Sequence, residues 1–123
     1  MIRERYDELV REMKALHQVR VRRWRRSTSG CAWLVRYQDG SLVRLIEARG
    51  AVPHGRTGAF AEKVLALPTE AERLALLIKG QAWVVRKIDE IPAADMTDDE
   101  KAFFADMREA HVVNIEAVRK LAA

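Results

Sequence analysis

The sequence is poor in several residue types, and each scarcity excludes a class of protein. Its one cysteine, Cys31, cannot form an internal disulfide, which favours a reducing compartment. Six glycines and three prolines are too few for a collagen-like or low-complexity chain. No apolar run reaches the roughly 18 residues that a membrane span needs, and the charged residues after Met1 do not resemble a signal sequence. We therefore expect a cytoplasmic protein with no membrane partner.

What the sequence does contain is typical of one globular domain over residues 1–123. Of its 123 residues, 49% are hydrophobic and 33% are charged. The net charge of +4 is uneven, with +6 over residues 1–50, +1 over 51–90 and −3 over 91–123. Two interpretations stay open. The basic residues 1–50 bind an anionic partner, or they attract the acidic residues 91–123 within one molecule or across a dimer.

Two segments show helical periodicity without a strong capping motif. In residues 2–17 the apolar side chains recur on one stripe, opposite a charged face. This pattern predicts an amphipathic helix. A shorter helix is predicted over about 58–67, with Thr57 as its cap and Pro68 after its end.

Two further helices are predicted from capping boxes. Thr69 with Glu72, and Thr97 with Glu100, have the spacing in which side chain and backbone of the first turn satisfy each other. Apolar residues continue at helical spacing after both motifs. We therefore expect antiparallel helices over about 69–90 and 97–122.

Residues 19–47 are expected to form strands. β-branched and aromatic residues are frequent, above all over residues 31–37. Asp39-Gly40 suits a tight hairpin turn, after which residues 42–47 would return as a third strand. The predicted fold class is therefore α+β: an N-terminal helix, a three-stranded antiparallel β-meander, then two or three C-terminal helices packed on the sheet.

One short internal repeat bears on the helix predicted over about 69–90. The segment Gly30-Cys-Ala-Trp-Leu-Val-Arg36 recurs as Gly80-Gln-Ala-Trp-Val-Val-Arg86. A true repeat would make residues 81–88 a strand, but the flanks differ and there is no third copy. We favour the helix, in which Gly80 costs about 1 kcal/mol relative to alanine.

The densest chemical feature is a run of five arginines and one tryptophan over residues 20–26. Arginine pairs with phosphate through its planar fork, and an exposed tryptophan can stack on a base. The structural alternative is an edge strand protected by its charges, with its arginines paired to acids of the last helix. The candidate nucleic-acid-binding residues are Arg20, Arg22, Arg23, Trp24, Arg25, Arg26, Arg36 and Arg44.

A second candidate anion site follows the expected strands. Residues 50–57 have the G-x-x-x-x-G spacing of a phosphate-binding loop, with arginine in place of the usual lysine. Arginine does not replace that lysine well, and the chain offers no acidic magnesium site, so a nucleotide hydrolase is disfavoured. The candidate anion-binding residues are Gly55, Arg56, Thr57 and Gly58.

Catalytic and metal-binding patterns are weak. His17, His54 and His111 are scattered without ligand spacing, and no nucleophile–base set stands out. His111 is expected to be a core or interface histidine with its hydrogen bonds satisfied, and Asp98, Asp99 and Glu100 to complement a helix dipole. We therefore expect no catalytic residue, no metal site and no cofactor.

A partial resemblance covers residues 1–48. The run Trp24-Arg25-x-Ser27-x-Ser29-Gly30-x-Ala32-Trp33, followed by Asp39-Gly40 and Leu45-Ile46-Glu47-Ala48, resembles small uncharacterised bacterial zincin-like proteins. The resemblance implies a later helix with H-E-x-x-H, which binds zinc. Residues 61–65 read Ala-Glu-Lys-Val-Leu, so only Glu62 could match and both ligand positions are apolar.

These observations favour a small non-enzymatic binding module whose basic meander contacts nucleic acid or another polyanion, such as an acidic protein surface. One alternative is a protein that interacts or forms a homodimer through its C-terminal helix. A further alternative is a degenerate zincin-like protein without catalytic metal. The candidate interface residues of the C-terminal helix are Phe103, Phe104, Met107 and Val112.

Overall fold

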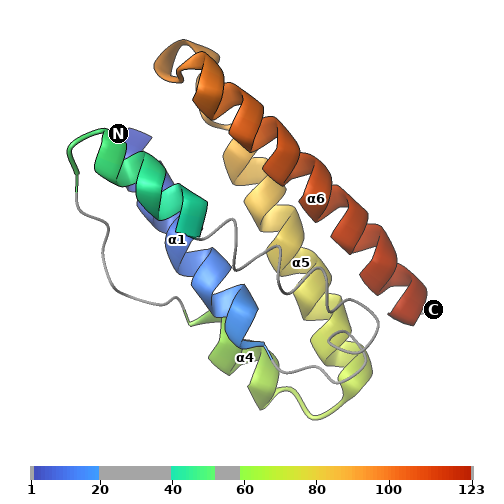
Figure 1. Cartoon of the computed structure of the whole chain (residues 1–123). Coiled ribbons are helices and arrows are strands. Elements are labelled where there is room, and N and C mark those ends of the chain that lie inside the picture. Colours follow the sequence, from blue (N-terminus) through green and yellow to red (C-terminus); the bar gives the residue numbers. More distant parts are fainter. Residues whose placement is uncertain (1, 20–39, 52–58, 123) are drawn as a thin grey trace.

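The computed structural model describes residues 2–19, 40–51 and 59–122, and every regular element within these ranges is helical (Figure 1). Residues 40–48 form one helix. The other elements are α1 (Ile2–Gln18), α4 (Phe60–Ala66), α5 (Glu70–Asp89), the short 3₁₀ helix η1 (Ala93–Asp95) and α6 (Asp98–Ala122).

The predicted α+β fold class is wrong, because the described residues contain no strand. The third strand of the meander, at 42–47, lies inside the helix of residues 40–48. Leu42 and Ile46 are both buried, and their spacing of four places them on one helical face against the core. The first two strands of the predicted meander lie outside the described residues.

The helices predicted from periodicity and capping boxes are confirmed. The shorter helix, α4, begins at Phe60 with Ala59 as its N-cap and no side-chain cap bond, so the cap predicted at Thr57 is wrong. In α5, Thr69 Oγ1 accepts a hydrogen bond from the Glu72 backbone at 3.2 Å, and the Glu72 side chain accepts one from the Thr69 backbone. Thr97 and Glu100 make the same two bonds at the start of α6. Residues 81–88 are helical, so the echo of residues 30–36 is not a strand here.

Helices α5 and α6 form an antiparallel pair, and they lie side by side along their length (Figure 1). Their buried positions alternate in spacings of three and four, as in a coiled coil. Asp89 on α5 and Arg108 on α6 form an ion pair at 2.8 Å on the surface of this pair. On α6 the buried Ile115 is additional to the spacings of three and four. The buried residues are Leu74, Leu77, Gln81, Val84 and Ile88 on α5, with Glu100, Phe104, Met107, His111, Asn114, Ile115 and Val118 on α6.

Helix α1 packs against α5, and its Tyr6 ring contacts Phe104 on α6. Its stripe of buried residues lies in the core, as its periodicity predicts, and includes Tyr6, Leu9, Val10 and Met13. Arg5 donates to the Glu90 carbonyl, so the start of α1 lies beside the end of α5. The short α4 contacts both α1 and α5 at the opposite end (Figure 1). Within the described ranges no helix has the length and apolar character to span a membrane.

Candidate functional site

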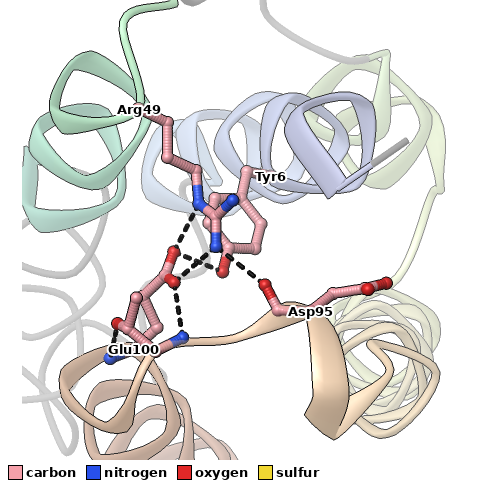
Figure 2. Close-up of polar contacts among 5 residues, drawn as sticks. Tyr6, Arg49, Asp95 and Glu100 are labelled. Atoms are coloured by element: carbon pink, nitrogen blue, oxygen red, sulfur yellow. Dashed lines mark hydrogen bonds and ion pairs between the residues drawn. The ribbon is translucent and has the colours of Figure 1, made fainter.

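A buried polar network joins the start of α1, the segment after the helix of residues 40–48, and the start of α6 (Figure 2). Glu100 is 4% exposed and accepts hydrogen bonds from Arg49 Nε and from the Tyr6 hydroxyl, both at 2.8 Å. Arg49 Nη2 also donates to Glu100 and to the Asp95 carbonyl. The guanidinium lies 5.8 Å from the centre of the Tyr6 ring.

This network is built for stability rather than for proton transfer. The Arg49 guanidinium holds the pKa of Glu100 down to about 2, while burial and the nearby carboxylate raise the pKa of Tyr6. Near neutral pH the carboxylate stays ionised and the phenol stays protonated. A general acid or base needs a pKa near the working pH, so neither group suits that role.

A second polar group lies inside the α5–α6 seam. Gln81 on α5, and Asn114 and His111 on α6, are 1%, 2% and 0% exposed. The His111 Nδ1 donates to the Met107 carbonyl at 2.9 Å, and burial lowers the pKa of the ring. Within the described residues, His111 Nε2, Asn114 Nδ2 and both polar atoms of Gln81 have no hydrogen-bond partner. His111 is thus buried in the core, which is one of the two predicted positions, but its Nε2 has no partner among the described residues although a satisfied ring was expected.

Among the residues that the structure describes, the most ligand-like feature is a pocket of about 360 Å³ where α1, α4 and α5 meet. It is named the basic aromatic pocket below. Its wall combines two aromatic rings, three cationic side chains, one carboxylate and small apolar groups. The lining residues are Glu12, Ala59, Phe60, Lys63, Leu76, Lys79, Gly80, Trp83 and Arg86.

The pocket depends on the absence of a side chain at Gly80. An added Cβ at this position would overlap the ring of Phe60. Glycine in a helix interior costs about 1 kcal/mol relative to alanine, and here it lets the first residue of α4 lie against α5. The close approach gives the pocket one of its aromatic walls.

The cations of the pocket are available to a ligand. Among the described residues, Lys63, Lys79 and Arg86 have no ion-pair or hydrogen-bond partner. Trp83 is half-buried, and Lys87 lies 5.5 Å from the centre of its ring. The Glu12 carboxyl has a raised pKa because it is partly buried, although Arg11 and Lys63 oppose the shift. The pocket therefore combines an excess of positive charge with aromatic faces.

A smaller pocket of about 310 Å³ between α1 and α5 has a different character. Its lining residues are Glu4, Arg5, Glu8, Lys87 and Glu90. Arg5 is bonded to the Glu90 carbonyl, and Lys87 pairs with Glu8 and Glu90. Because its cations already have partners, this pocket is the weaker candidate for a ligand.

Most of the predicted anion-binding residues lie outside the described residues. These are Arg20, Arg22, Arg23, Trp24, Arg25, Arg26 and Arg36 of the basic set, and Gly55, Arg56, Thr57 and Gly58 of the loop. Arg44 is described: it lies exposed on the helix of residues 40–48, where it donates to Ser41 at 3.2 Å.

The predicted interface residues of α6 are not on one surface. Phe104 and Met107 are 1% and 0% exposed, so both belong to the core of this chain. Phe103 and Val112 are half-buried, and the Phe103 ring packs edge-on against Phe104 with centroids 5.2 Å apart. The described residues include no group of three or more histidine, cysteine or acidic side chains that could hold a metal ion.

Sequence reasoning missed the basic aromatic pocket altogether. Gly80 and Trp83 belong to the segment 80–86 that repeats residues 30–36. The glycine there interrupts a helix whose apolar residues otherwise keep the helical period. A glycine that weakens a helix indicates a close contact, and that was the available signal. The partner ring, Phe60, belongs to another helix, so no spacing rule connects it to Gly80.

Comparison with known protein families identifies a domain that covers most of this chain. Residues 31–120 match the model of DUF6306, a domain of unknown function. The matched range includes α4, α5, nearly all of α6 and most of the lining of the basic aromatic pocket, but not Glu12. No curated protein and no solved structure matches the chain.

Proposed function

Since the chain belongs to the DUF6306 family, we propose that it is a non-enzymatic binding module for single-stranded nucleic acid, with the basic aromatic pocket as its contact site. The proposal rests on one observation. Lys63, Lys79 and Arg86 line one pocket together with Phe60 and Trp83, and the described lining holds three cations against a single carboxylate, Glu12.

The chemistry of single-stranded nucleic acid fits this combination. Proteins that bind single strands use cationic side chains along the backbone and aromatic side chains on which bases stack, worth about 1–3 kcal/mol per base. A duplex hides its base faces, so it could use only the cations. An acidic protein surface would likewise leave Phe60 and Trp83 without a specific role.

The basic run over residues 20–26 adds to the expected affinity through its charge. Five arginines in seven residues raise the local concentration of any polyanion near the chain. In this proposal the arginine run attracts the strand, and the basic aromatic pocket holds one of its bases.

The proposal is tested by titrating a fluorescein-labelled single-stranded oligonucleotide at several salt concentrations. We expect the triple variant Lys63→Gln, Lys79→Gln, Arg86→Gln to bind more weakly. The slope of log affinity against log salt should also become shallower by about 2, because each of three lost phosphate contacts contributes about 0.7. Trp83→Leu should weaken binding while leaving the salt slope unchanged.

A matched control removes the same charge elsewhere. Lys101→Gln, Arg119→Gln and Lys120→Gln alter three exposed cations of α6 that do not line the pocket. This variant should keep the wild-type affinity to within a few fold. Equal binding by the pocket variant and the control, or equal wild-type affinity for a polyglutamate peptide, would contradict the proposal.

A further inference from the structure

A carboxylate lines the same pocket as the three cations. Glu12 reaches the basic aromatic pocket from α1, where it is half-buried. It makes no hydrogen bond or ion pair with any described residue, and its burial raises its pKa. A negative charge in a site for a phosphate-bearing ligand opposes binding unless the ligand offers it a donor. Glu12 therefore has to meet the part of the ligand that carries N–H groups.

An ionised carboxylate only accepts hydrogen bonds, and its two oxygens can accept from two adjacent donors at once. Guanine presents such a pair, the N1–H and the N2 amino group, side by side on one edge. Adenine and cytosine offer one amino group beside a ring nitrogen whose lone pair would face the second oxygen. Uracil and thymine offer one N–H between two carbonyl oxygens.

Resting on the proposed function, we propose that Glu12 makes the basic aromatic pocket selective for guanine, by accepting hydrogen bonds from its N1–H and N2 amino groups. The rings of Phe60 and Trp83 supply faces for the planar base, and Lys63, Lys79 and Arg86 supply charge for its phosphate. A volume of about 360 Å³ is at the small end for ligand sites and suits one nucleotide rather than several.

The experiment compares mononucleotides that differ in the base edge. Guanosine, inosine, adenosine, cytidine and uridine monophosphates are titrated by calorimetry at pH 8. Inosine monophosphate lacks only the N2 amino group of guanine. Because a hydrogen bond to a charged group is strong, we expect guanosine monophosphate to bind at least about tenfold more tightly than the other four.

Glu12→Gln should change the affinities in opposite directions. Guanosine monophosphate should lose its advantage, because the amide offers one acceptor and places a donor against the base. The other nucleotides should bind as well or better, since a charge that repels their phosphate is gone. Glu62→Gln is the matched control, because Glu62 is an exposed acid of α4 outside the pocket lining and should leave all five affinities unchanged.

The outcomes separate the two proposals. If all five nucleotides bind with equal affinity and the oligonucleotide still binds in a salt-dependent way, the role of Glu12 is refuted and the proposed function stands. The same holds if guanosine monophosphate keeps its advantage in Glu12→Gln. If neither nucleotides nor oligonucleotides bind, the proposed function itself fails.

Discussion

Replacing Glu100 by glutamine should destabilise the fold more than any other charge-removing change on α6. The Glu100 carboxylate is buried, paired with Arg49 and hydrogen-bonded by Tyr6. Its pKa falls from 4.5 to about 2. At about 1.4 kcal/mol per pH unit, this difference corresponds to roughly 3 kcal/mol of folding free energy at neutral pH. Breaking a buried ion pair on one side has a similar cost.

The two pKa values of Glu100 also determine how its contribution to stability depends on pH. A group whose pKa is lower in the folded protein stabilises the fold fully above its unfolded pKa. That contribution disappears as the pH falls through the folded value. The stabilisation from Glu100 should therefore be complete above about pH 5 and be lost between pH 4.5 and about 2. The difference between wild type and Glu100→Gln should shrink over the same interval.

Urea unfolding followed by circular dichroism at 222 nm measures this difference at pH 7 and at steps down to pH 2.5. Glu116→Gln is the control, because Glu116 is exposed and pairs with Arg119 only on the surface of α6. That change should cost about 0.5 kcal/mol or less. A cost below about 1 kcal/mol for Glu100→Gln at pH 7, or a cost that does not vary with pH, would refute the reasoning.

Three further predictions concern other parts of the helical bundle, and urea unfolding checks each. Gly80→Ala should lower stability by about 1–3 kcal/mol despite the better helix propensity of alanine, because its Cβ overlaps the Phe60 ring; a stabilised variant would contradict the close contact. Asn114→Leu should raise stability by about 1 kcal/mol, since the Nδ2 group is buried without a described partner; a clear loss would mean that the amide is satisfied. Thr69→Ala should cost about 1 kcal/mol through loss of the cap on Glu72, whereas no change would show that the capping box adds nothing.

The helical parts of the fold could be predicted because their signals are local. The capping boxes at Thr69 and Thr97 depend on residues three apart, and the buried stripe of α1 follows the period of a single helix. Residues 42–47 misled the prediction because β-branched residues and the preceding Asp39-Gly40 favour a hairpin. This segment forms a helix instead, because the spacing of Leu42 and Ile46 lets both side chains pack into the core from one helical face.

The polar network and the basic aromatic pocket could not be predicted from spacing. Arg49 and Glu100 are 51 residues apart, and only the tertiary packing of three separate segments brings them together with Tyr6. The sequence identified Glu100 as a capping residue but gave no sign of its second partner. The lining of the pocket likewise comes from three helices. Sequence periodicity describes each helix separately, so it does not show which residues of the three meet.

The contact between Gly80 and Phe60 implies a way to sort the relatives of this chain. Because one wall of the pocket exists only where position 80 has no side chain, a larger residue there would displace the facing ring and reshape the cavity. Members of the family with glycine at this position should share a ligand. Members with a bulkier residue should keep the helical scaffold and have lost that ligand or exchanged it for another.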